Sequence, residues 1–202
     1  MIKLILVRHG TTICNEGGAL SGLTDSILSE KGKLQASKLA DYLKDKNIDK
    51  IYTTPFSRTK ETVDRLSRVK NIQIEERCQL NEINFGDFEG LPFESIEEKY
   101  PEEVKKMINE GFKYKYPNGE SLEDTFMRVK TELKKIMSDN ENSTVLICSH
   151  GGTIRNIISY LLCDDYKYHW NFRVDNGSIT EIEVENNFAV INKLNDTTYL
   201  EL

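Results

Sequence analysis

The stretch from Ile2 to Val7 constrains the fold of this chain more than any other. It is short, almost entirely apolar and rich in Ile, Leu and Val. This pattern is typical of a strand that is buried on both faces, in a parallel sheet with helices on either side. Arg8 and His9 follow at once, and Gly10 allows a sharp turn behind them. Because ligands bind at the carboxyl ends of strands in open α/β sheets, Arg8 and His9 are candidate functional residues.

The same arrangement occurs a second time near residue 150. Residues 144–148 form another short apolar run, and it leads into Ser149-His150-Gly151-Gly152. The chain has three histidines, and His9 and His150 both occupy this position at the end of a core strand. Two unrelated structural histidines would not be expected to share that context. The third, His169, is expected to pack near a loop with Trp170, and we assign it no role.

The remaining patterns predict an α/β chain with a three-layer α/β/α architecture. Apolar stripes at helical spacing predict helices over residues 36–43, 59–66, 122–136 and 154–161, and short strands are expected at 49–53 and 71–74. Ser57 and Ser121 are the expected N-caps of two of these helices. Alternation over residues 180–185 predicts a half-exposed antiparallel strand, followed by a hairpin at Asn186-Asn187 into residues 188–194. We therefore expect a mainly parallel sheet with an antiparallel edge.

The stretch from residue 80 to residue 119 breaks this regularity. It is rich in Gly, Pro, aromatic and acidic residues, with only short helical pieces around residues 94–110. We interpret it as an excursion from the sheet that roofs a site, within one domain that spans residues 1–202. Its aromatic side chains either line a pocket for the substrate or belong to the core.

Composition excludes several classes of function. The formal net charge is −6 and no basic block is present, which argues against a general nucleic-acid or membrane-surface binder. Four scattered cysteines without a Cys-x-x-Cys pair are typical of reduced thiols, and a strand that begins at residue 2 leaves no room for a secretory leader or a membrane span. We therefore expect a cytoplasmic protein.

Arg58 is a candidate phosphate ligand. It follows Ser57 in the first turn of a predicted helix, where the guanidinium and the free backbone N–H groups point the same way and together bind phosphate well. The alternative interpretation is a solvated helix residue. A metal site is disfavoured, because neither Cys14 nor Glu82 lies at a recognisable ligand spacing from the histidines and two arginines would oppose a cation. We expect neither a metal nor another cofactor.

Six groups of residues, in order along nearly the whole chain, resemble one known family. They are Arg8-His9-Gly10-Thr11 with Asn15, Leu28 and Gly32 before Gln35-Ala36, Ser57-Arg58 with Glu61-Thr62, Leu80-Asn81-Glu82 with Phe85-Gly86 and Glu89-Gly90, Gly119-Glu120-Ser121, and Ser149-His150-Gly151-Gly152. Together they resemble the histidine phosphatase superfamily, which has the phosphoglycerate-mutase-like fold.

The resemblance implies a role for each candidate residue. His9 would be the nucleophile that forms a phosphohistidine, and Glu82 would be the proton donor to the leaving alcohol. Arg8, Arg58 and His150, helped by Asn15, would hold the phosphoryl oxygens. No metal would then be needed. These residues form the expected catalytic and substrate-binding set.

The family contains both phosphatases and sugar-phosphate mutases. Mutases resemble one another in an arginine-rich stretch that is absent from residues 82–90 here, so we expect a phosphatase. The segment Phe85 to Gly90 and the compact length resemble α-ribazole phosphatases and broad-specificity phosphatases. The expected substrate is a small phosphorylated metabolite, with α-ribazole 5′-phosphate the leading candidate. The alternatives are a phosphoglycerate mutase and a catalytically silent phospho-ligand binding protein. We expect a monomer or a homodimer, with any partner at the antiparallel edge over residues 180–184.

Overall fold

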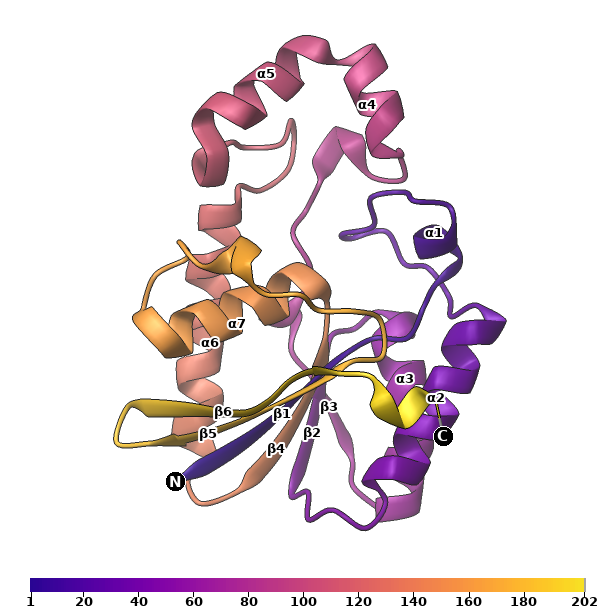
Figure 1. The fold of residues 1–202 in the computed structure, drawn as a ribbon, viewed down its shortest axis with the longest axis vertical. Coiled ribbons are helices and arrows are strands. Elements are labelled where there is room, and N and C mark those ends of the chain that lie inside the picture. The colour runs from indigo at the N-terminus through magenta and orange to yellow at the C-terminus, as the bar shows by residue number, and fades with distance from the viewer. Residues whose placement is uncertain (202) are drawn as a thin grey trace.

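The computed structural model describes residues 1–201, and its centre is one six-stranded sheet (Figure 1). The strands are β1 (Ile2–Arg8), β2 (Lys50–Thr53), β3 (Ile74–Glu76), β4 (Thr144–Ser149), β5 (Ile179–Glu185) and β6 (Phe188–Asp196). Their order in the sheet is β3-β2-β4-β1-β5-β6. The first four are parallel to one another, and β5 and β6 pair antiparallel. The predicted mainly parallel sheet with an antiparallel edge is confirmed.

Four helices cover the two faces of this sheet: α2 (Glu30–Leu43), α3 (Ser57–Lys70), α6 (Leu122–Asp139) and α7 (Gly151–Cys163). The shorter helices lie beyond its carboxyl edge; they are α1 (Ile13–Glu16), α4 (Phe93–Lys99) and α5 (Pro101–Glu110). Figure 1 shows α2 and α3 on one face and α6 and α7 on the other. The predicted three-layer α/β/α architecture is therefore confirmed.

The central strand β1 is buried on both sides, as its apolar run predicts. Leu4 and Leu6 pack into the core beneath α6 and α7, whereas Ile5 and Val7 pack into the core beneath α2 and α3. This alternation follows from the two-residue repeat of a strand. Because β1 is packed between two cores, the residues at and after its end have a well-defined position on the carboxyl edge of the sheet.

The C-terminal hairpin agrees with its prediction, except that its first strand is not the sheet edge. Asn186 and Asn187 adopt φ angles of 49° and 63°, as a tight hairpin turn requires. The buried residues of β5 include Ile182 and Val184. β5 itself lies between β1 and β6, and β6 continues to Asp196. The free strand edge on the antiparallel side of the sheet therefore belongs to β6, because β6 occupies the outer side of β5.

Two local predictions near α3 are wrong. Ser57 is not the N-cap: Phe56 occupies that position without a side-chain bond. The Ser57 backbone N–H instead donates to the Asp25 carboxylate at 3.0 and 3.1 Å, so an acidic residue from a distant loop satisfies this helix end. The third strand lies at Ile74–Glu76 rather than 71–74, because Asn71 ends α3 in a left-handed conformation with φ of 53°.

The excursion from residue 80 to residue 119 extends beyond the carboxyl edge of the sheet. In Figure 1, α4 and α5 lie above the point where β1 and β4 end. Glu89 ties this segment to the loop after α1, since its carboxylate accepts hydrogen bonds from the backbone N–H groups of residues 22, 23 and 24. The loop and the excursion therefore close over the same edge.

Candidate active site

His9 directly follows β1 and has a defined tautomer. Its ring Nδ1 lies 2.8 Å from the Gly10 carbonyl oxygen, and because a carbonyl only accepts, Nδ1 carries the proton. The lone pair is then on Nε2, for which no hydrogen-bond partner occurs among residues 1–201. The side chain is 5% exposed. His9 therefore presents a free, unprotonated nitrogen from a rigid position.

The surroundings of His9 keep its imidazole neutral. Burial lowers the pKa of His9 well below its ordinary value, and the charges of Arg8 and Arg58 lower it further. The hydrogen bond to Gly10 opposes this shift but does not reverse it. A neutral ring is the form in which a histidine can attack phosphorus.

Arg58 and His150 form a buried pair beside His9. Arg58 is 1% exposed, and its Nε donates to Nδ1 of His150 at 3.2 Å. A guanidinium only donates, so His150 carries its proton on Nε2, which lies 3.1 Å from the Thr54 hydroxyl. The rings of His9 and His150 are 5.2 Å apart between centroids. Burial and then the Arg58 charge lower the pKa of His150, so this ring is a neutral hydrogen-bond donor.

Arg8 packs against the first turn of α7. Its Nη1 donates to the Val174 carbonyl at 2.7 Å. A Cβ on Gly151 would lie 3.4 Å from the Arg8 guanidinium carbon, so the Arg8 side chain packs directly over this glycine. Arg8 is half-buried, and its Nε has no partner among the described residues. The two strand-end motifs thus meet, as β1 and β4 are adjacent and parallel.

Glu82 reaches the same point from the excursion. Its carboxylate accepts hydrogen bonds from the Gly152 N–H at 2.8 Å and from the Ile83 N–H at 3.1 Å. A Cβ on Gly152 would lie 2.5 Å from Glu82 Oε1. A side chain at this position would force the Glu82 carboxylate to move from where it lies. The Glu82 carboxylate therefore lies at the N-terminus of α7, on the backbone N–H of a residue two positions beyond His150.

Asn15 is held next to His9 by a residue that sequence reasoning missed. Asn176 donates to the His9 carbonyl at 3.1 Å and to Asn15 Oδ1 at 3.0 Å. Asn15 Oδ1 also accepts from the Thr12 N–H, so its amide nitrogen is the group left to face a ligand. Asn176 belongs to no motif of the sequence. Thr54 was also missed, although it directly follows β2, a strand-end position like those of His9 and His150.

The aromatic residues of the excursion divide between its own core and the site. Phe88 and Tyr114 are buried, at 0% and 3% exposure, and belong to the core. Tyr116 is half-buried and packs edge-on against Phe85 at 5.1 Å. Burial and the charge of Glu82 raise the pKa of Tyr116 to about 12. Because the charge of Glu82 acts on its hydroxyl, Tyr116 is the aromatic residue of the excursion that lies near Glu82.

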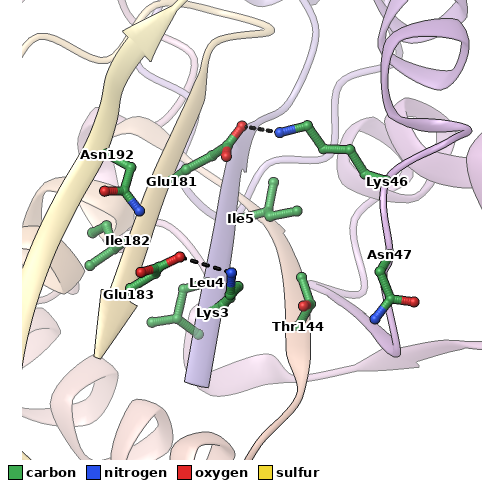
Figure 2. A pocket seen from close by; sticks show the side chains of 10 residues that line it. All are labelled: Lys3, Leu4, Ile5, Lys46, Asn47, Thr144, Glu181, Ile182, Glu183 and Asn192. Carbon is green, nitrogen blue, oxygen red and sulfur yellow. Dashed lines mark hydrogen bonds and ion pairs between the residues drawn. The ribbon is translucent and has the colours of Figure 1, made fainter. Parts of the chain in front are cut away.

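Figure 2 shows a separate cavity of about 340 Å³ near the opposite end of the sheet, where β1 and β4 begin. Its charged side chains already pair with one another, Lys3 with Glu183 at 2.9 Å and Lys46 with Glu181 at 2.6 Å. No histidine lines it. The chemistry-bearing residues lie instead at the carboxyl edge.

Among residues 1–201, no cluster of three or more His, Cys, Asp or Glu residues is arranged to hold a metal ion. Every helix in the same range is too short or too polar to span a bilayer. The side chains at the carboxyl edge of the sheet are those of arginine, histidine, asparagine and glutamate, and Nε2 of His9 is the free imidazole nitrogen among them.

Comparisons with known proteins show the family to which this chain is similar. The model of the histidine phosphatase superfamily (branch 1) matches residues 4–197. Phosphoserine phosphatase 1 from Hydrogenobacter thermophilus is 38% identical over 200 residues, which are 99% of this chain and 95% of that protein. The crystal structure of the α-ribazole phosphatase from Shigella flexneri matches with a TM-score of 0.90 at 27% identity, over 96% of each chain. That of a phosphoglycerate mutase from Bacillus anthracis matches with a TM-score of 0.83 at 28% identity, over 99% of this chain and 95% of that one.

Proposed function

The chain belongs to the histidine phosphatase superfamily (branch 1), and on that premise we propose that it hydrolyses phosphomonoesters through a phosphohistidine at His9. One observation carries the proposal. The hydrogen bond from His9 Nδ1 to Gly10 leaves Nε2 as the free ring nitrogen, in a site that also holds two arginines, a second histidine and a glutamate. This arrangement supplies a nucleophile, cations for phosphoryl oxygens and a proton carrier.

In the first step, His9 Nε2 forms a bond to phosphorus as the bond to the ester oxygen breaks. Glu82, in its protonated form, gives its proton to the departing alcohol. Arg8, Arg58, the His150 Nε2–H and the Asn15 amide donate to the phosphoryl oxygens, whose charge is spread in the transition state. His150 would transfer its hydrogen bond from Thr54 to the phosphoryl group, without losing its proton.

In the second step, water replaces His9 on phosphorus. The Glu82 carboxylate takes a proton from the water as its oxygen bonds to phosphorus and the bond to Nε2 breaks. Phosphate leaves, and His9 and Glu82 return to their starting protonation states. General acid–base help of this kind contributes about 10²–10⁴-fold to the rate. No step uses a metal ion, so we propose a metal-independent enzyme.

The proposed substrate is a small phosphorylated metabolite. The likeness to the α-ribazole phosphatase fold and the aromatic pair Tyr116 and Phe85 near Glu82 favour α-ribazole 5′-phosphate. Phosphoserine is a second candidate, favoured by the 38% identity to a phosphoserine phosphatase along almost the whole chain. A mutase reaction is less favoured, because residues 80–119 contain no arginine to hold a second phosphate group.

The proposal is tested by phosphate release from p-nitrophenyl phosphate with EDTA present. We expect the wild type to remain active and His9→Ala to lose activity, with the wild type alone forming an acid-labile, base-stable phosphoprotein. Activity retained by the variant would overturn the role of His9, and activity abolished by EDTA would overturn metal independence. Turnover of α-ribazole 5′-phosphate, phosphoserine and 3-phosphoglycerate, followed as phosphate release or as transfer, then separates the candidate substrates and the mutase alternative.

A further inference from the structure

Arg128 lies in α6 and is not one of the proposed catalytic or substrate-binding residues, yet its guanidinium makes five hydrogen bonds next to the site. Nη1 donates to the carbonyls of Gln79 and Asn81, both at 2.8 Å. Nη2 donates to the carbonyl of Glu82 at 2.9 Å. The remaining two bonds go to the Glu120 carboxylate, from Nε at 2.8 Å and from Nη2 at 3.0 Å. A guanidinium has five N–H donors, so Arg128 is fully used.

The three carbonyls belong to the short segment that ends in Glu82. This segment has no strand ladder to fix it, because β3 ends at Glu76 and only a single 3-10 turn (Cys78–Leu80) precedes Asn81. Side chains take the place of the ladder. Besides Arg128, the Ser149 hydroxyl donates to the Leu80 carbonyl and the Thr153 hydroxyl to the Asn81 carbonyl, both at 2.8 Å.

Glu120 completes the arrangement from the far end of the excursion. Its carboxylate accepts from Arg128 and also from the Asn84 N–H at 3.0 Å, two residues beyond Glu82. Burial opposes ionisation of Glu120, but the hydrogen bonds from Arg128 and Asn84 outweigh it and lower the pKa of Glu120. The side chains of Arg128 and Glu120 are 16% and 26% exposed, so solvent screens this ion pair only in part.

We propose that Arg128, held by Glu120, is the positioning residue for the proton carrier Glu82. The pair forms hydrogen bonds with the backbone on both sides of Glu82, from residue 79 to residue 84. These bonds hold the Glu82 backbone where its carboxylate can accept from the Gly152 N–H. A small displacement of a catalytic group lowers the rate strongly. This proposal rests on the proposed function, because it assigns Arg128 a role only through the proton transfer of Glu82.

A positioning role predicts a dependence on the leaving group that a general packing role does not. p-Nitrophenolate leaves without needing a proton, whereas an alkoxide needs one. We expect Arg128→Met to lower kcat/KM about 10²-fold for an alkyl phosphomonoester such as glycerol 2-phosphate, which is the lower end of the range for general acid–base catalysis. For p-nitrophenyl phosphate under single-turnover conditions, the loss in phosphohistidine formation should be below about tenfold.

The second measurement is a double-mutant cycle with Glu82→Gln. If Arg128 acts through Glu82, Arg128→Met should have almost no further effect on alkyl ester hydrolysis once the proton carrier is absent. Additive losses in the cycle, or equal losses for the two esters, would overturn the proposal. A wild type inactive on both esters would instead overturn the proposed function.

Two variants guard against simple misfolding. Arg128→Met leaves the Glu120 carboxylate without its cation. The double variant Arg128→Met with Glu120→Gln removes both charges, and it should show the same selective loss on the alkyl ester as Arg128→Met alone. Arg128→Lys keeps the charge but cannot reach all three carbonyls, so it should show a smaller selective loss. Arg68→Met is the matched control, because Arg68 is 74% exposed and contacts Asp64 on its own helix. Its kinetics should equal those of the wild type.

Discussion

His9 and His150 lie at the ends of adjacent parallel strands, yet their hydrogen bonds give them opposite tautomers. The Gly10 carbonyl can only accept, which protonates Nδ1 of His9 and frees Nε2. The Arg58 guanidinium can only donate, which protonates Nε2 of His150. One ring is therefore suited to attack phosphorus and the other to donate to a phosphoryl oxygen. The sequence shows two similar histidines, and only their neighbours distinguish them.

The substitution Gly152→Ala tests the position of the Glu82 carboxylate, because it adds a single methyl group next to it. The Cβ of Gly152→Ala would lie 2.5 Å from Glu82 Oε1, so the carboxylate must move away from its backbone donor. We expect kcat for an alkyl phosphomonoester to fall about 10- to 10²-fold, a part of the contribution of general acid–base catalysis.

Steady-state kinetics checks this effect, together with a thermal melt that shows the variant folded. Gly17→Ala is the matched control, because a Cβ there would meet its nearest atoms at ordinary contact distances of 3.7 and 3.8 Å. Unchanged kcat in a folded Gly152→Ala variant would contradict the close approach of Glu82 to α7.

Among the secondary-structure elements, α6 shows which helix start the sequence predicts well, and α3 shows which one it misses. The Ser121 hydroxyl accepts from the Asp124 N–H and the Asp124 carboxylate accepts from the Ser121 N–H, the capping box that the pattern Ser-x-x-Asp predicts. The predicted start of α3 fails because its cap, Asp25, is 32 residues away from Ser57. Local signals place a helix end when its partner lies within the same turn, and they miss it when the partner comes from a distant loop.

The N-cap of α6 has a measurable contribution to stability. Ser121→Ala removes the acceptor for the Asp124 N–H, and we expect it to cost about 1 kcal/mol of unfolding free energy. For a chain of this length the melting temperature should fall by about 2–4 °C. Calorimetry at pH 7.5 measures the shift.

The same variant separates stability from positioning. Arg128 lies two turns into α6, beyond the frayed end that loss of the cap produces, so the preference between alkyl and p-nitrophenyl esters should stay at its wild-type value. A changed preference in Ser121→Ala would contradict a role of the cap in stability alone.

At the scale of the whole molecule, all three histidines are buried and neutral, which makes folding sensitive to acid. Burial, and then the charge of Arg155, lower the pKa of His169 to about 4. Its Nδ1 lies 2.7 Å from Asn156 Oδ1. The unfolded chain binds a proton at His169 from about pH 6.5 downward, while the folded chain does not until about pH 4. The stability from this group is therefore fully present above pH 6.5 and is lost as the pH falls.

Urea unfolding at pH 7.5 and pH 5 tests this linkage. We expect the wild type to lose about 2 kcal/mol more than His169→Gln over that interval, from the shift in the pKa of His169 alone. His9 and His150 titrate in both proteins, so their contributions cancel in the comparison. An equal loss in both proteins would show that His169 is not held neutral by the fold.

The sequence alone determined the architecture, and it predicted most of the residues that the structure brings together at the carboxyl edge of the sheet. Two apolar runs that each end in a histidine and a glycine predict a buried parallel sheet, because such runs are typical of strands buried on both faces and the carboxyl ends of parallel strands lie at one edge. Tertiary structure decided everything that depends on contacts between distant segments. The tautomers of His9 and His150, the bond from Asn176 to Asn15 and the hold of Arg128 on residues 79–82 each join groups far apart in the chain. No local pattern records such partners, since a hydrogen bond depends on distance in space.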